Sequence, residues 1–218
     1  MNRKITLNRI IDNGAVAVIR LSEPNKIMHV AEALYNGGVE NLEITMTVPN
    51  ALTIIEKVSK EMCDSVLVGV GSILDCETAE KAIEAGAKYI VSPIFDEDII
   101  RAGHKFDLPV MPGAFTPTEI QKAYKAGADI VKVFPADVLG MKFFSGVKAP
   151  MPHLRLMPTG GVTLTNADQW FNAGACAVGI GNALVDQDAI ARNDYKVLTE
   201  KAKILINNIQ EYRSKKKL

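Results

Sequence analysis

Short apolar runs alternate with amphipathic stretches along most of this chain. Apolar residues recur at the 3.6-residue spacing of a helix in stretches such as residues 24–38 and 50–62. Between such stretches, runs rich in Val, Ile and Leu predict buried strands. The expected strands lie near residues 15–20, 41–46, 66–71, 88–92, 109–111, 129–134, 154–159 and 176–180.

Four segments of the chain resemble one another: each has the end of a helix, then a glycine, then an apolar strand. They read NGGVENLEIT, EAGAKYIVSP, KAGADIVKVF and NAGACAVGIG, and their aligned glycines are Gly38, Gly86, Gly127 and Gly174. A glycine at the end of a helix favours the left-handed conformation that closes it. Each interval between these glycines is long enough for two strand–helix units.

Strict alternation of strands and helices predicts a parallel sheet, and eight such units predict a closed (β/α)8 barrel. A doubly wound open sheet is the alternative. No linker or change in composition divides the chain, so residues 1–218 are expected to form one barrel domain. An N-terminal helix at about 5–13 and a C-terminal helix at about 194–216 are expected to flank the barrel.

Two charged residues interrupt the apolar strands. In the strand at 129–134, Val131 and Val133 form one face, so Lys132 points the other way, into the barrel. The same alternation in the strand at 41–46 points Glu43 inward. Both follow the glycine of their repeat by five positions, and alternate strands share a layer of the barrel interior. The two side chains are therefore expected to face each other, with Gly179 at the matching position leaving space beside them.

A buried pair of this kind has two interpretations. It can be a structural ion pair, although burying two charges costs several kcal/mol per ion. Alternatively, apolar neighbours such as Ile130 and Phe134 favour the uncharged amine of Lys132. An uncharged lysine attacks a ketone to form a Schiff base, and Glu43 opposite it would move protons.

The carboxyl ends of the last two expected strands carry glycine-rich turns. Barrel enzymes commonly bind phosphate in these two loops. Here they contain Gly160 and Gly161, then Gly181 and Asn182, whose backbone N–H groups and following helix N-termini would favour an anion. Ordinary tight turns are the alternative. Arg20 ends the first expected strand and is a candidate for binding a carboxylate, with a rim salt bridge as the alternative.

Composition and charge exclude several classes of protein. The chain is 48% apolar and 23% charged, and its 25 basic residues balance 25 acidic ones. It therefore has no net field to attract nucleic acid or an anionic membrane. No apolar run is long enough to span a bilayer, and the N-terminus has no apolar signal-peptide core. Three widely separated cysteines predict reduced thiols rather than disulfides or a metal site, which favours a cytoplasmic protein.

Several motifs, taken together and in this order, carry a resemblance to a known family. They are LEIT, VGVGS, VSP, MPGAFTP, VKVFPAD, MPTGGV and VGIGNALV, and the match as a whole covers about Val16 to Val185. This combination resembles the 2-dehydro-3-deoxy-6-phosphogluconate (KDPG) and 4-hydroxy-2-oxoglutarate (KHG) aldolases. The resemblance implies a class I aldolase on a (β/α)8 barrel, commonly a homotrimer, that needs no metal or other cofactor.

The resemblance also implies roles for particular residues. Lys132 takes the place of the Schiff-base lysine and Glu43 that of the general acid and base. Many members have a carboxylate-binding arginine where this chain has Thr47, so Arg20 is the candidate for that role. The remaining expected substrate-binding residues are Ser72 for the carboxylate, Pro93 and Phe134 for the pocket wall, and Thr159, Gly160, Gly161, Gly181 and Asn182 around the phosphate.

The expected reaction is reversible cleavage of KDPG to pyruvate and glyceraldehyde 3-phosphate, with KHG as a possible second substrate. Two other enzymes remain as alternatives. One is a phosphate-binding barrel isomerase or epimerase, and the other is the galactonate-type aldolase of the same family. A barrel that binds sugar phosphate without turnover is the non-enzymatic alternative.

Overall fold

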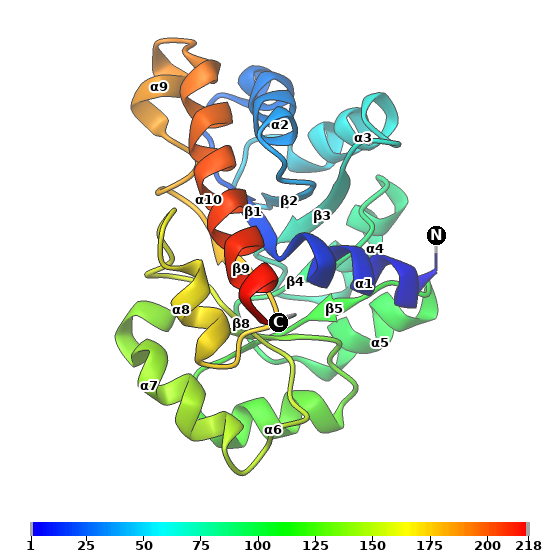
Figure 1. The fold of residues 1–218 in the computed structure, drawn as a ribbon. Helices are drawn as coiled ribbons and strands as arrows, with labels where there is room; N and C mark the ends of the chain where they lie inside the picture. Colours follow the sequence, from blue (N-terminus) through cyan, green and yellow to red (C-terminus); the bar gives the residue numbers. More distant parts are fainter. Residues whose placement is uncertain (1, 217–218) are drawn as a thin grey trace.

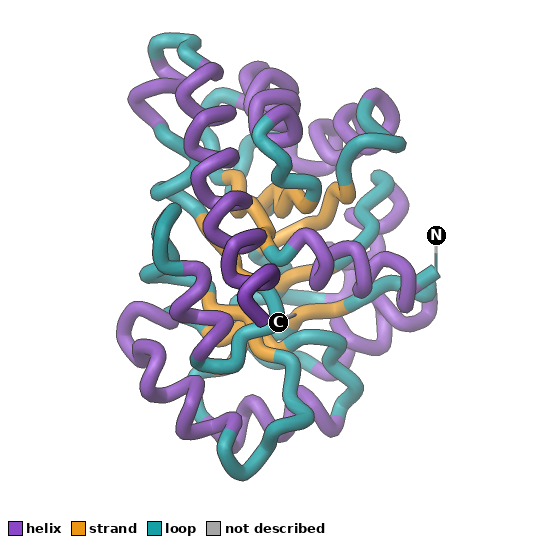
Figure 2. The backbone as a smooth tube through the Cα atoms, viewed as in Figure 1, coloured by secondary structure: helices purple, strands orange, loops and turns teal. Residues whose placement is uncertain are grey.

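The computed structural model describes residues 2–216 and shows a core of parallel strands surrounded by helices (Figures 1 and 2). The strands follow the eight expected positions. They are β1 (Ala15–Ile19), β2 (Asn41–Thr45), β3 (Leu67–Gly71), β4 (Ile90–Val91), β5 (Val110–Met111), β6 (Gly113–Ala114), β7 (Val131–Val133), β8 (Leu156–Pro158) and β9 (Val178–Ile180).

One strand position of the barrel is taken by two short strands. The run predicted at 109–111 appears as β5, and after Pro112 the chain continues as β6. Proline has no N–H to donate to a sheet, which interrupts the ladder at this point. Because β5 pairs with β4 and β6 pairs with β7, the two pieces together take one position in the barrel.

The pairing of the strands closes the barrel. One sheet has the order β5-β4-β3-β2-β1-β9 and the other has the order β6-β7-β8, with every pair parallel. Two isolated bridges, Leu156 with Ala175 and Thr159 with Gly179, join β8 to the strand region of β9. The (β/α)8 barrel is therefore confirmed and the open doubly wound sheet is wrong.

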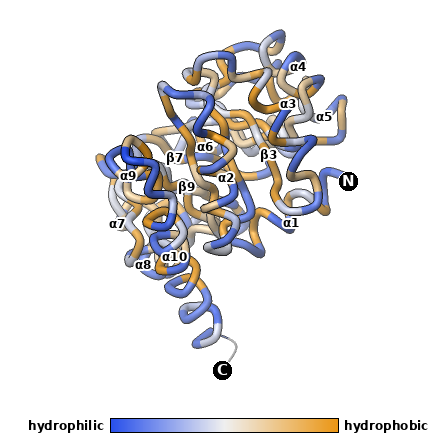
Figure 3. The backbone as a smooth tube through the Cα atoms, turned by 90° about the horizontal axis from the view of Figure 1, so that it is seen from above, coloured by the Kyte–Doolittle hydropathy of each residue, from blue (hydrophilic) through white to orange (hydrophobic). Residues whose placement is uncertain are grey.

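Helices cover the outside of the strands (Figure 2). They are α1 (Arg3–Asn13), α2 (Ile27–Asn36), α3 (Ala51–Glu61), α4 (Cys76–Glu84), α5 (Glu97–Lys105), α6 (Pro117–Lys125), α7 (Ala136–Lys148), α8 (Ala167–Asn172), α9 (Gln187–Ala191) and α10 (Tyr195–Lys216), with a 3-10 turn at Pro24–Lys26. The last turns of α10 extend beyond the barrel and are mostly hydrophilic (Figure 3). Among the helices of residues 2–216, none has both the length and the apolar character needed to cross a bilayer.

The alternation of strand side chains produces two apolar layers. The larger layer lies between strands and helices and contains Leu42, Ile44, Val131 and Val133. The smaller one fills the barrel and includes Val16, Tyr89, Val91, Met111, Ile130 and Met157. The faces predicted for the strands at 41–46 and 129–134 are confirmed, because their apolar residues meet the helices. The charged residues on the inner faces of these two strands are Glu43 and Lys132.

The four repeat glycines close their helices as predicted. Gly38, Gly86, Gly127 and Gly174 have φ values of 93°, 105°, 99° and 106°, in the left-handed region that residues with a Cβ disfavour. Each turn leads directly into the next barrel strand. The repeat therefore sets the height at which β2 and β7 start, and with it the height of Glu43 and Lys132.

At the amino ends of the strands, Asp129 joins three segments. Its carboxylate lies 2.7 Å from Arg3 Nε, accepts a hydrogen bond of 2.9 Å from the Val110 N–H, and lies 3.3 Å from His104 Nε2. The Asp129 side chain is only 5% exposed. A buried acceptor with these partners holds α1 and α5 against the closed end of the barrel.

Replacing Asp129 with alanine is expected to lower the free energy of unfolding by about 2–3 kcal/mol, because it leaves the buried Val110 N–H without this acceptor and removes the ion pair with Arg3. Urea denaturation of the variant and the wild type measures this. Asp64→Ala, at an exposed position, is the matched control and should change stability little. An Asp129→Ala protein as stable as that control would contradict this role.

Candidate active site

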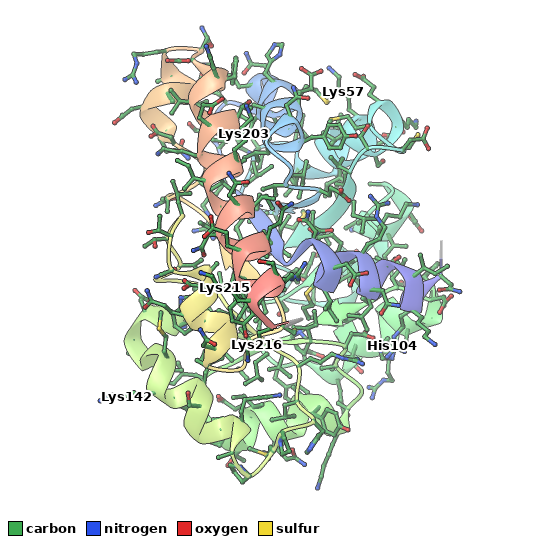
Figure 4. All side chains as sticks on the ribbon, in the orientation of Figure 1. Lys57, His104, Lys142, Lys203, Lys215 and Lys216 are labelled. Atoms are coloured by element: carbon green, nitrogen blue, oxygen red, sulfur yellow. The ribbon has the colours of Figure 1, made fainter. Side chains whose placement is uncertain are left out.

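Lys132 and Glu43 meet inside the barrel. Lys132 Nζ lies 3.7 Å from Glu43 Oε1, and the two side chains are 6% and 1% exposed. The exposed lysines Lys57, Lys142 and Lys203 lie on the outer helices instead (Figure 4). Both Glu43 oxygens are buried, and within residues 2–216 neither has a hydrogen-bond partner. A purely structural ion pair needs closer contact and satisfied lone pairs to offset its desolvation, so this geometry favours a chemical role.

Strand β3 leaves room for the Glu43 carboxylate. A Cβ built on Gly71 would lie 2.0 Å from Glu43 Oε1, and one on Gly69 would lie 2.2 Å from the ring of Tyr89. Both glycines face the barrel interior at alternate positions. Their missing side chains make the space that the carboxylate and the phenol occupy. Gly69, Gly71 and Tyr89 were missed as site residues, although alternate glycines in an apolar strand are a visible signal of close approach.

A second group of expected residues lines one cavity of about 300 Å³ at the carboxyl ends of β1, β8 and β9. The cavity brings together every residue expected around the phosphate, and Arg20 as well. Its lining includes Arg20, Thr159, Gly160, Gly161, Gly181 and Asn182. Gly160 and Gly161 have φ values of 99° and 71°, so the turn between β8 and α8 requires glycine at both positions.

Gly179 lines this cavity, so the expected space is present, but the Thr159 side chain takes part of it. A Cβ on Gly179 would lie 2.4 Å from Thr159 Oγ1. The Thr159 hydroxyl is buried and, among the described residues, has no hydrogen-bond partner. Thr159 lines the cavity of about 300 Å³ and directly follows β8. Because β8 pairs with β7, Thr159 lies between this cavity and the strand that carries Lys132.

The expectation that helix N-termini face this cavity is wrong. Helix α8 begins at Ala167 and α9 begins at Gln187, several residues after their glycine turns. After the first turn, Asn166 instead donates to the Gly161 carbonyl and accepts from the Thr163 N–H. The groups available to an anion are therefore the backbone N–H groups of the turns, the side chains of Thr159 and Asn182, and the Arg20 guanidinium.

The remaining expected residues lie at the carboxyl ends of other strands. Phe134 follows β7 and is 39% exposed, with its ring centroid 5.3 Å from Lys132 Nζ. Phe134 and Pro93 line a second cavity of about 340 Å³. Ser72 follows β3 with a φ of 60°, an uncommon conformation for serine that is often found at functional sites. Thr47 follows β2, and its hydroxyl lies 2.7 Å from that of Thr45.

Comparison with known proteins identifies the family. The family model described as KDPG and KHG aldolase matches residues 7–201. The chain belongs to this family. It is 33% identical to the 2-dehydro-3-deoxy-phosphogluconate aldolase of Pseudomonas aeruginosa, over 90% of this chain and 89% of that protein. It is 29% identical to the KHG/KDPG aldolase of Escherichia coli strain K12, over 93% of this chain and 95% of that one.

The fold of this aldolase is also that of solved family members. The KDPG aldolase of Legionella pneumophila, crystallised with pyruvate captured as a covalent carbinolamine intermediate, superposes with a TM-score of 0.86. The two are 25% identical, and the match covers 93% of this chain and 98% of the other. The resemblance inferred from the motifs is therefore confirmed, and so is the assignment of the chain as an aldolase.

Gly71→Ala is expected to lower kcat/KM of this aldolase by about 10- to 100-fold, because the added methyl group displaces the Glu43 carboxylate from its position opposite Lys132. Steady-state kinetics of pyruvate release measures the change. Gly146→Ala, in α7, is the matched control, since a Cβ there meets nothing within 4 Å. Equal activity of the two variants would show that the space at Gly71 is not needed.

Proposed function

We propose that this aldolase reversibly cleaves KDPG to pyruvate and glyceraldehyde 3-phosphate through a Schiff base on Lys132. The proposal depends above all on one observation: Lys132 Nζ lies 3.7 Å from a buried carboxylate with no other polar partner in the described residues. The amine has a base beside it to take its protons, and the surrounding barrel interior is apolar. These are the conditions that make a lysine nucleophilic.

In the first stage, Lys132 Nζ attacks the C2 ketone of the substrate and forms a carbinolamine. Glu43 accepts a proton from the attacking amine and returns one to the hydroxyl that leaves as water. The product is a protonated imine between C2 and Nζ. Its positive charge makes it an electron sink for the carbon atoms beside it.

In the second stage, Glu43 takes the proton of the C4 hydroxyl and the C3–C4 bond breaks. The electron pair of that bond passes to the imine, which becomes an enamine, and glyceraldehyde 3-phosphate leaves. Glu43 then returns a proton to C3, and water hydrolyses the imine to release pyruvate. One carboxylate can serve each proton transfer because neither of its oxygens has a hydrogen-bond partner in the described part of the chain.

The two anionic ends of the substrate determine the remaining assignments. The glycine turns with Thr159 and Asn182 bind the phosphate in the cavity of about 300 Å³. Arg20 lines the same cavity and takes the carboxylate-binding role of the arginine that many family members carry at the position of Thr47. Ser72 assists at the carboxylate, and Pro93 and Phe134 form the apolar wall of the mouth.

Assay of three substrates tests this proposal. Pyruvate release is measured with KDPG, with its galactonate isomer and with KHG, using lactate dehydrogenase as the coupling enzyme. We expect the highest kcat/KM for KDPG, in line with the relative at 33% identity, and slower cleavage of KHG. Faster cleavage of the galactonate isomer would reassign the substrate, and no pyruvate from any of the three would overturn the proposal.

Three further assignments accompany the reaction. We infer that residues 1–218 form one domain, that three copies of the chain assemble as a homotrimer, and that the protein acts in the cytoplasm. Exposed apolar side chains near the barrel mouth, among them Ile94, Phe115 and Val138, support assembly. Sedimentation equilibrium reports the mass of the assembly, and a monomer at micromolar concentration would contradict the trimer.

A further inference from the structure

One buried tyrosine, Tyr89, takes no part in the proposed reaction. Tyr89 immediately precedes β4 and is among the largest fully buried side chains of the protein. Its hydroxyl is buried and, within residues 2–216, has no hydrogen-bond partner. An unsatisfied buried donor is costly, and each one in a folded protein needs an explanation.

The phenol lies beside the Glu43 carboxylate along β3. A Cβ on Gly69 would lie 2.3 Å from Tyr89 Cζ, the ring atom that carries the hydroxyl. A Cβ on Gly71 would lie 2.0 Å from Glu43 Oε1. Inward positions two residues apart on a strand are separated by roughly 6.6 Å. The phenol and the carboxylate lie over these neighbouring positions, and no direct hydrogen bond joins them. One water molecule making two hydrogen bonds of about 2.8 Å each would bridge a donor and an acceptor that both lack partners among the described residues.

The chemistry of the two groups is complementary. Burial, and next the negative charge of Glu43, raise the pKa of the Tyr89 phenol well above its usual value. The phenol therefore keeps its proton at every pH at which the enzyme works. It is available as a hydrogen-bond donor but not as a base.

We propose that Tyr89 is a positioning residue that donates its O–H, through one buried water, to the Glu43 carboxylate and thereby favours the ionised form of that carboxylate. This inference rests on the proposed function, in which Glu43 transfers the protons. Tyr89 does not touch the substrate in this account, because it lies in the apolar layer inside the barrel, with Met111 and Met157.

The surroundings of Glu43 limit which groups can control its ionisation. From β7 it faces Lys132, and from the residue before β4 it faces Tyr89. Strand β3 presents Gly69 and Gly71, which carry no charge. Lys132 changes its charge during the reaction, whereas the phenol does not. A hydrogen bond from Tyr89 is therefore a constant influence on the carboxylate throughout the reaction.

Tyr89→Phe tests this inference through the pH dependence of kcat/KM. Loss of the donor makes Glu43 easier to protonate, so the acid limb of the profile should move to higher pH by about half to one unit. Activity should be several-fold lower below that limb and close to wild type above it. Tyr124→Phe, which changes an exposed tyrosine, should leave the profile in place.

A second substitution covers the possibility that the phenylalanine protein folds poorly. Site-specific replacement of Tyr89 with 3,5-difluorotyrosine keeps the shape and gives a stronger donor, so the acid limb should move to lower pH. Superposable profiles for the wild type and both variants would overturn the inference, as would a uniform loss of activity at all pH values. Wild-type labelling by pyruvate and borohydride shows separately whether the Schiff-base function itself holds.

Discussion

Replacing Lys132 with arginine is expected to abolish aldol cleavage, lowering kcat by about 10⁴-fold or more. The guanidinium keeps its positive charge opposite Glu43 but stays protonated and cannot form an imine with a ketone. The variant therefore separates covalent chemistry from electrostatics. Pyruvate release from KDPG, coupled to NADH oxidation by lactate dehydrogenase, measures the loss.

The control for this substitution is Lys57→Arg, which makes the same chemical change at an exposed lysine of α3 (Figure 4). It should retain full activity. An isomerase or epimerase in which Lys132 acts only through its charge predicts a different result, because a cation would survive at position 132. Substantial residual turnover by Lys132→Arg, with its fold intact by circular dichroism, would favour that alternative.

Glu43→Gln is expected to lower kcat by about 10²- to 10⁴-fold, the usual range for loss of a general acid and base. The amide has nearly the shape of the carboxylate but cannot accept the proton of the carbinolamine or of the C4 hydroxyl. Lys132 remains in place, so the variant should still be labelled by pyruvate and borohydride, at a reduced rate. Single-turnover kinetics with KDPG, alongside labelling, separates the slowed steps.

The matched control is Glu61→Gln, at an exposed carboxylate at the end of α3, which should behave as the wild type. Urea denaturation of both variants shows whether the buried, now unpaired Lys132 also destabilises the fold. If Glu43→Gln keeps a kcat within about threefold of wild type, Glu43 is not the residue that transfers these protons, and a water chain must replace it.

The features that the sequence predicted well are periodic ones. Side chains alternate along every strand, and the repeat places a glycine at a fixed distance before Glu43 and before Lys132. Those two rules are enough to put both residues inside the barrel at one height, because the barrel interior is layered. The separation of 3.7 Å agrees with local rules applied to two distant segments.

The features that it did not predict depend on contacts between segments. The split between β5 and β6 arises at Pro112, where each piece pairs with a different neighbour. The late start of α8 reflects the side-chain bonds of Asn166 with its own turn. The place of Tyr89 beside Glu43 depends on two glycines of a third strand. No single stretch of sequence contains that information, because three strands meet there.

Borohydride reduction in the presence of pyruvate tests the Schiff base itself. The protein is incubated with pyruvate, reduced, digested and analysed by mass spectrometry, with the Lys132→Arg protein treated in parallel. We expect one adduct per chain, on the peptide that contains Lys132, heavier by the mass of pyruvic acid less one oxygen atom. An unmodified Lys132 in an active enzyme, or an adduct that persists in Lys132→Arg, would contradict the account.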